Sequence, residues 1–130
     1  MQKYKYIAHS DDAKFEAKVK ELLLYRKIVK IERHGDQDAT LTLDNGTEIT
    51  VEGNRGCGGC SNGWYYLDEI NKCDNVITNV ACTFESDEYD DIYRIIVFAD
   101  NKEITCVQYS GSDNGYYGTG YELYIKIKEE

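Results

Sequence analysis

Two cysteines lie among five glycines in residues 53–63, and three aromatic residues follow directly. Cys57 and Cys60 form a C-x-x-C, the spacing by which a tight turn supplies two thiolates to a zinc ion. Cys73 and Cys82 follow, so four thiolates could surround one zinc ion. A second C-x-x-C, which a strong zinc signature would contain, is missing, and Cys82 falls on the apolar face of an expected strand. The sequence therefore favours structural cysteines without a cofactor, with zinc as the minority hypothesis.

The same loop offers two other chemistries. A thioredoxin-like redox pair would lie at the N-terminus of a helix within a βαβ unit, a pattern that this sequence lacks. Consecutive main-chain N–H groups in a glycine-rich turn can bind an anion, and Arg55 adds one positive charge. Neither G-x-G-x-x-G nor G-x-x-x-x-G-K-[ST] is present. An anion site and a plain tight corner therefore explain the glycines about equally well.

A second loop repeats this chemistry near the C-terminus, because NGWYY at 62–66 recurs as NGYYG at 114–118. The two loops together hold nine of the eleven glycines. Amide and carboxylate groups beside flat aromatic faces suit a purine-like or sugar-like ligand, or a protein hot spot. We expect the 53–66 and 111–121 segments to meet at one end of a sheet and to form one site. Its expected residues are Arg55, Cys57, Gly58, Gly59, Cys60, Asn62, Gly63, Trp64, Tyr65, Asp74, Asn75, Asp113, Asn114, Tyr116 and Tyr117.

Catalysis finds little support in the sequence. His9 and His34 are the only histidines, and neither lies in a pattern with a nucleophile. No G-x-S-x-G or H-E-x-x-H motif occurs. The run ESDEYDD at 85–91 carries five carboxylates in seven residues, without the ligand spacing of an EF-hand, so it predicts a solvated loop. These observations favour a non-enzymatic protein.

The elements that position the loops follow from hydrophobic periodicity. Residues 10–27 predict one amphipathic helix, with Ser10 as its N-cap. Residues 64–70 predict a short helix or an irregular segment. The buried stripe of the first helix is expected to consist of Phe15, Val19, Leu22 and Leu23.

Alternating apolar and polar residues predict strands in most of the remaining chain. Asn45-Gly46 joins two of them and is typical of a type I′ turn, which needs positive φ at both positions. A second hairpin turns near Asp100-Asn101. In residues 76–85 the expected apolar face holds Val76, Thr78, Val80, Cys82 and Phe84, and in the last strand it holds Tyr121, Leu123, Ile125 and Ile127. The sum is a single α+β domain, residues 1–130, with one N-terminal helix packed on a mostly antiparallel sheet of about six or seven strands.

Composition limits the class of protein. The chain has 130 residues and a net charge of −9, of which residues 1–34 contribute +4 and the remainder −13. Such an acidic body disfavours nucleic acid as a direct partner. It could mimic nucleic acid toward a basic protein, but the favoured interpretation is that the charge only aids solubility. No apolar run approaches the ~20 residues that span a bilayer, no secretory signal is evident, and the odd cysteine count suits a reducing compartment. We therefore expect a cytoplasmic protein without a membrane partner, and the oligomeric state stays open.

The motifs CGGCSNGWYYLDEINKCDNVITNV and, near the C-terminus, NGYYGTGY resemble a family of small proteins of unknown function found mainly in bacteriophage genomes. The resemblance covers roughly residues 53–128 and transfers no activity. It implies a viral accessory protein in the host cytosol, where such proteins often antagonise host defence. The leading hypothesis is then a binding protein for a nucleotide-like signal. The alternatives are an acidic inhibitor that occludes a host defence protein or nucleic-acid enzyme, and a zinc-stabilised structural module.

Overall fold

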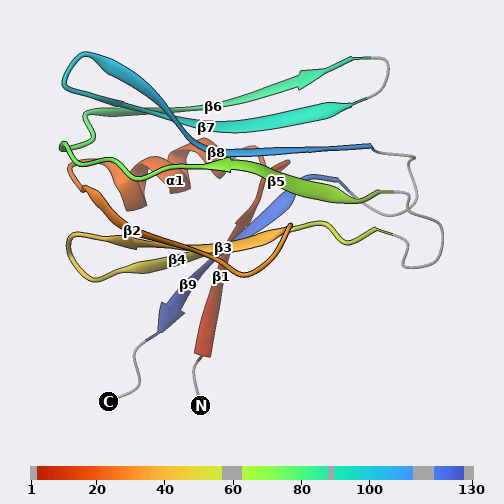
Figure 1. Ribbon diagram of the computed structural model, residues 1–130, viewed down its shortest axis with the longest axis horizontal. Coiled ribbons are helices and arrows are strands. Elements are labelled where there is room, and N and C mark those ends of the chain that lie inside the picture. The colour runs from red at the N-terminus through yellow and green to blue at the C-terminus, as the bar shows by residue number, and fades with distance from the viewer. Residues whose placement is uncertain (1–2, 57–62, 88–89, 113–118, 128–130) are drawn as a thin grey trace.

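The computed structural model describes residues 3–56, 63–87, 90–112 and 119–127, and these form nine strands and one helix (Figure 1). The strands pair into two antiparallel sheets that face each other. The first sheet has the order β1 (Lys3–His9), β9 (Tyr121–Ile127), β4 (Glu48–Gly53), β3 (Asp38–Leu43) and β2 (Ile28–Arg33). The second has the order β5 (Tyr65–Ile70), β8 (Lys102–Gly111), β7 (Asp91–Ala99) and β6 (Asn79–Ser86).

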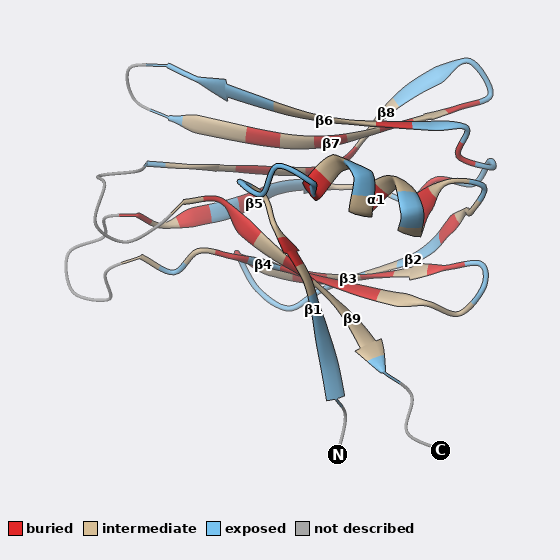
Figure 2. Cartoon of the chain, turned by 180° about the vertical axis from the view of Figure 1, so that it is seen from behind, coloured by how far each residue is buried: buried red, intermediate tan, exposed pale blue. Residues whose placement is uncertain are grey.

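The core lies between the two sheets because alternate residues of each strand face inward (Figure 2). Ala39, Leu41 and Leu43 of β3 are buried, and so are Ile95 and Val97 of β7. Aromatic rings fill much of the space between these aliphatic walls. Four of them belong to the buried tyrosines Tyr65, Tyr93, Tyr109 and Tyr121.

The single helix, α1 (Phe15–Leu23), packs against the edges of β1 and β6, which belong to different sheets. Glu16 Oε2 accepts a hydrogen bond from the main-chain N–H of Cys82 in β6 (2.8 Å). Lys18 Nζ donates one to the carbonyl of Ile7 in β1 (2.9 Å). Charged side chains of the helix thus satisfy main-chain groups of two edge strands, which blunts those edges against pairing with another chain.

The predicted fold class is wrong. Strands make up 61% and helix 8% of the described residues, so the protein is mostly β, not an α+β domain with one sheet of six or seven strands. The helix does not cover a sheet face but joins the edges of two sheets. The error arose because local periodicity identifies strands and does not show how strands distant in sequence divide between sheets.

The helix is also shorter than residues 10–27. Its N-cap is Lys14, not Ser10, because Ser10 Oγ accepts a hydrogen bond from the N–H of Tyr121 (3.1 Å). The helix has ended by Tyr25, which has a positive φ of 66°. The expected stripe is present, with Phe15, Val19 and Leu23 buried and Leu22 half-buried.

Residues 64–70 do not form a helix or an irregular segment. They contain β5, in which buried Tyr65 and Leu67 alternate with exposed Tyr66 and Asp68. The period of two was present in the sequence, but the cluster of aromatic residues obscured it.

The type I′ turn expected at Asn45-Gly46 is not present there. At Asn45-Gly46 only Gly46 has a positive φ (86°). The N–H of Gly46 donates to the carbonyl of Leu43, and the N–H of Leu43 donates to the carbonyl of Thr47. This is a three-residue loop with a glycine bulge in place of a type I′ turn. Positive φ at both positions occurs instead at Asp100 (51°) and Asn101 (61°).

Strands β1 and β9 continue beyond the sandwich as a two-stranded ribbon (Figure 1). Consequently Ile127, expected to face inward, is 43% exposed, and Ile125 is only partly buried. The expected face of residues 76–85 is also partly wrong. Val76 and Phe84 are exposed, and Thr78 precedes β6, whereas Val80 is buried as expected.

Candidate functional site at the loop end

The described flanks of the two glycine-rich loops lie together at one end of the sandwich, which we call the loop end. Gly53 pairs with Tyr121, and Asn54 N–H donates to the carbonyl of Gly120 (2.9 Å). On the other sheet, Tyr65 pairs with Gly111. Segments 53–56, 63–66, 111–112 and 119–121 are therefore neighbours. The expected site residues Cys57, Gly58, Gly59, Cys60, Asn62, Asp113, Asn114, Tyr116 and Tyr117 lie outside the described residues.

Two glycines allow the chain to pack tightly around Tyr65. A Cβ atom on Gly53 would lie 2.5 Å from the carbonyl oxygen of Tyr65, and one on Gly111 would lie 2.7 Å from Cγ of Tyr65. Neither Gly53 nor Gly111 has a positive φ, so close approach explains both glycines. Other flanking glycines do serve corners, since Gly63 (77°) and Gly120 (68°) have positive φ.

Tyr65 is a core residue and not a stacking face. Its side chain is 0% exposed, so the prediction that its ring contacts a ligand is wrong. The Tyr65 hydroxyl donates to Asp91 Oδ2 (2.7 Å), and Ser86 Oγ donates to Asp91 Oδ1 (2.7 Å). Asp91 belongs to the acidic run, so these bonds fix that end of the run beside the two loops.

Gln37 organises the loop end, and no pattern in the sequence indicates this role. Gln37 is 5% exposed, and its Nε2 donates to the carbonyls of Asn54 and Tyr65, both at 3.1 Å. Its main-chain carbonyl accepts the hydroxyl of Tyr109. Every such bond joins residues far apart in sequence, so no local pattern could have shown the role.

Among the described residues, Trp64 and Tyr66 contribute exposed aromatic surface to the loop end. Their rings are nearly parallel, at 12°, with centroids 6.3 Å apart. Tyr66 is 45% exposed, while Trp64 is intermediate. The two residues are two apart in sequence and therefore project from the same side of the chain. Tyr66 was not among the predicted site residues, although the alternation in residues 64–68 would have placed it beside Trp64.

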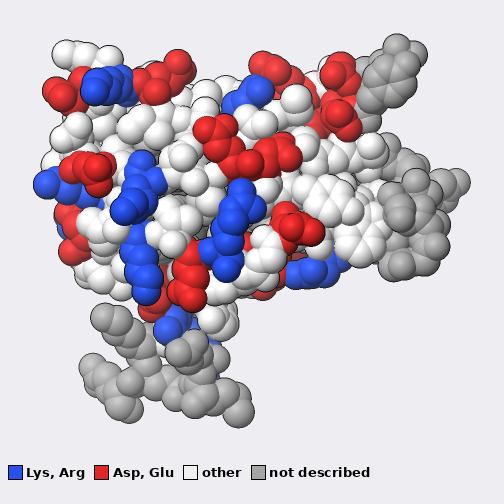
Figure 3. Space-filling view, in the orientation of Figure 1, with Lys and Arg blue, Asp and Glu red and all other residues white. Residues whose placement is uncertain are grey.

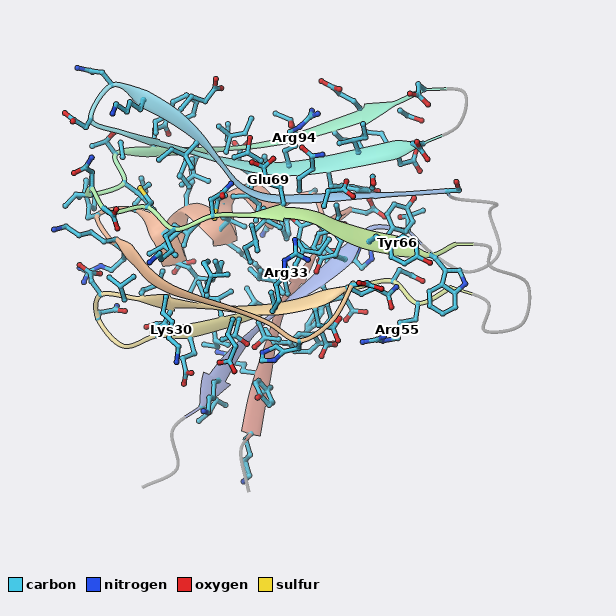
Figure 4. The ribbon with its side chains drawn as sticks, viewed as in Figure 1. Lys30, Arg33, Arg55, Tyr66, Glu69 and Arg94 are labelled. Atoms are coloured by element: carbon cyan, nitrogen blue, oxygen red, sulfur yellow. The ribbon has the colours of Figure 1, made fainter. Side chains whose placement is uncertain are left out.

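Arg55 lies at this end, as expected (Figure 4), but its charge is already compensated by a carboxylate. Its guanidinium bonds to the carboxylate of Asp38 and to Oε1 of Gln37 (2.8 Å). Asp38 is mostly buried, whereas the Arg55 side chain is 62% exposed. A phosphate would have to compete with a carboxylate that is fixed in place, so Arg55 is a weaker anion ligand than the sequence suggested.

The other exposed charges that the structure describes beside the loop end are negative (Figure 3). Glu85, Asp87 and Asp90 are exposed at the β6–β7 hairpin, next to Asp91. Arg94, the nearest described arginine on β7, pairs with Glu85 (3.3 Å) and bonds to Gln108 (2.9 Å). Within the described chain, carboxylates and aromatic rings therefore dominate this surface.

Three other predicted site residues lie elsewhere. Cys73, Asp74 and Asn75 follow the far end of β5, whose six residues span roughly 20 Å at about 3.3 Å per residue. Cys73 is buried and its thiol donates to the carbonyl of Asn75 (3.2 Å). Asp74 and Asn75 are exposed there and take no part in the loop end, which corrects their assignment as ligand-binding residues.

The cysteines do not assemble a metal centre in the described part of the chain. No group of three or more His, Cys, Asp or Glu residues there could hold a metal ion. Burial raises the pKa of Cys82 to about 12, and likewise that of Cys106, which keeps both as thiols. A four-cysteine zinc site would need Cys73 to reach the opposite end of β5. A zinc ion bound through Cys57 and Cys60 stays a prediction.

The fold and this end define a small, mostly β protein with an aromatic and acidic surface. The chain belongs to the family described as "Domain of unknown function (DUF7448)", whose model matches residues 21–123. That range includes β2, β3 and β4, which the motif resemblance did not cover. No curated protein and no solved structure matches the chain. Across the described segments, no helix is long and apolar enough to cross a bilayer.

Proposed function

We propose that this chain is a non-enzymatic binding protein whose loop end occupies a basic groove on a protein partner. One observation carries the proposal: the hydrogen bond from Tyr65 to Asp91 holds the acidic run beside the exposed Trp64–Tyr66 pair. Tryptophan and tyrosine are common hot-spot residues, and complementary charge accelerates docking. Arg55 and Arg94, which could have attracted an anion, are both paired with carboxylates.

The resemblance to phage proteins supplies the context of the proposal. A phage accessory protein with an acidic docking surface would act as a nucleic-acid mimic, occupying the groove of a host defence or nucleic-acid enzyme. In this role the chain needs no nucleophile and no cofactor. It needs a rigid display of carboxylates and aromatic rings, and the sandwich supplies rigidity through its hydrogen-bonded strands.

Charge neutralisation at the β6–β7 hairpin tests this proposal. In bacterial lysate, the immobilised protein should capture a partner that duplex DNA displaces and that 0.5 M salt releases. The variant Glu85→Gln/Asp87→Asn/Asp90→Asn should lower the affinity of the purified partner at least about tenfold, because the steering and contacting charges are lost. Asp91 is left unchanged because it bonds to Tyr65.

The matched control is Asp74→Asn/Asp100→Asn/Glu103→Gln, which removes three exposed carboxylates away from the loop end. It changes the net charge equally and should leave the affinity within about twofold, since long-range effects are screened beyond a Debye length of about 8–10 Å. Nucleic-acid mimicry through this end would be refuted if duplex DNA did not displace the captured partner, or if both variants lost the same affinity for it.

A nucleotide-like signal is the second candidate, and the Trp64–Tyr66 geometry favours it. Their nearly parallel rings form one flat aromatic surface on which a base could stack. The acidic surroundings argue against this candidate, because they repel phosphate.

Trp64 is the only tryptophan, so its fluorescence reports directly on this candidate. Titration with a panel of cyclic and ADP-ribose-type nucleotides should quench it, with micromolar dissociation constants confirmed by calorimetry. Tyr66→Ala should weaken binding about tenfold, whereas Tyr25→Ala, an exposed tyrosine elsewhere, should not. No binding in the micromolar range would end this candidate and leave the protein-docking proposal standing.

A further inference from the structure

A hollow of about 370 Å³ lies between α1 and the projecting β1–β9 ribbon. It shares no residue with the loop end. Its volume falls within the roughly 300–1,000 Å³ typical of small-molecule pockets. The lining residues are Lys5, Tyr6, Ile7, Lys18, Glu21, Leu22 and Ile125.

A β-bulge accompanies the opening of the hollow. The pairing of β1 with β9 shifts between Tyr6 and Ala8, so Ile7 is an extra residue in β1. A bulge bends its strand and increases the local twist. Ala8 is buried within the sandwich, whereas residues 3–6 are exposed on the ribbon (Figure 2). The ribbon therefore diverges from the helix at Ile7, and space remains between them.

The inner wall of the hollow is apolar. Ile7, Leu22 and Ile125 are partly buried and pack against the core, and each still borders the hollow. They come from β1, α1 and β9, so three elements contribute one aliphatic side chain each. A ligand that covers these side chains gains the free energy of apolar burial, about 25 cal/mol per Å².

Two lysines lie at the rim. Lys18 uses one of its three N–H donors on the carbonyl of Ile7, which leaves two for another acceptor. Lys5 forms no ion pair with any described residue. Glu21, on the solvent side of α1, is the one carboxylate of the lining. The rim thus favours an anion, in a chain whose net charge is −9.

We propose that this hollow binds an anionic amphiphile, with an aliphatic chain against Ile7, Leu22 and Ile125 and a carboxylate head between Lys5 and Lys18. The two halves of such a ligand match the two halves of the lining. The site is independent of the proposed docking function, because it uses other residues on a different part of the molecule.

Calorimetric titration with decanoate tests the proposal, and decylamine provides a probe with the same chain and the opposite charge. Decanoate should bind at least about tenfold more tightly than decylamine, because the head meets two ammonium groups. Lys5→Glu should weaken decanoate binding at least about tenfold, whereas Lys102→Glu, an exposed lysine at the β7–β8 turn, should change it less than about twofold. Lys5 is exposed, so its substitution should leave the thermal unfolding curve unchanged.

A second readout separates the hollow from the loop end. Decanoate should shift amide NMR signals of α1 and β1 and leave the fluorescence of Trp64 unaltered. Absence of decanoate binding up to millimolar concentration, equal binding of decylamine, or insensitivity to Lys5→Glu would each overturn the proposal. A dimer by light scattering that does not take up decanoate would show that a second copy covers the hollow, and would overturn it as well.

Discussion

The free energy of unfolding should fall steeply above pH 10, by about 1.4 kcal/mol per pH unit for each buried tyrosine. Burial raises the pKa of Tyr93, Tyr109 and Tyr121, and a hydrogen bond to Asp11 adds to the effect at Tyr93. The unfolded chain releases these phenolic protons near pH 10, whereas the folded chain retains them. Rising pH therefore favours the unfolded state, and three such groups give a slope of about −4 kcal/mol per pH unit.

Urea unfolding at half-unit steps from pH 8 to 11 measures this slope. Tyr109→Phe should reduce the slope between pH 10 and 11 by the contribution of one titrating group, about 1.4 kcal/mol per pH unit. Loss of its bond to Gln37 should also lower the free energy of unfolding at every pH. Phe15→Leu is the matched control, because it disturbs the ring contact with Tyr121 without removing a titrating group. It should lower stability equally at all pH values. A flat profile between pH 10 and 11 would show that the tyrosines are not held protonated.

Below pH 10 two cysteines, the partly buried Cys82 and the buried Cys106, act in the same direction. Burial raises the pKa of Cys82 and Cys106 to about 12, so their stabilising contribution is complete below the unfolded value near 9 and is lost as pH rises. The decline should therefore begin near pH 9 and steepen above pH 10. The part of the tyrosinate absorbance that comes from the buried rings should appear in step with unfolding.

Most strands could be predicted from the sequence because their signal is local. Alternation in residues 39–43 identifies β3, and the polar tetrad around Asp100-Asn101 identifies the turn before β8. The division into two sheets could not be predicted, since it depends on pairings such as β1 with β9, at opposite ends of the chain. Ser10 shows the same limit. Its side chain suits an N-cap, but its hydroxyl oxygen accepts a hydrogen bond from the N–H of Tyr121, more than a hundred residues later in the chain.

The sequence predicts where the candidate site lies, but not which residues contact one another there. Concentrated glycines and aromatic residues indicated where two segments would meet, and their described flanks do lie together. Which of two adjacent tyrosines faces the core depends on the neighbouring strands, and Tyr65 points inward while Tyr66 is exposed. The neutralisation of Arg55 depends on Asp38, which the sequence places among strand residues with no visible connection to the loop.

Gly111→Ala should destabilise the protein by about 3 kcal/mol, at the upper end of the usual cost of overpacking. The added methyl group would overlap the carbonyl oxygen of Trp64 and lie within 2.8 Å of two ring carbons of Tyr65. A main-chain oxygen cannot move aside by a rotamer change, so β5 must shift away from β8. Because Trp64 carries that carbonyl, its fluorescence spectrum should change in the folded variant.

Gly35→Ala separates this packing effect from backbone strain. Gly35 has a φ of 130°, but a Cβ there would meet no atom within 4 Å, so its cost should come from backbone strain alone, about 1–3 kcal/mol. Equal losses in the two variants, with an unchanged Trp64 spectrum, would mean that the methyl group is accommodated at Gly111 without a shift of β5. A larger loss of stability in Gly111→Ala, together with the altered Trp64 spectrum, would show that the packing around Tyr65 also positions the exposed aromatic pair. The same packing positions Asp91. The glycines that first suggested a ligand site would then act by fixing where Trp64 and the acidic run lie relative to each other.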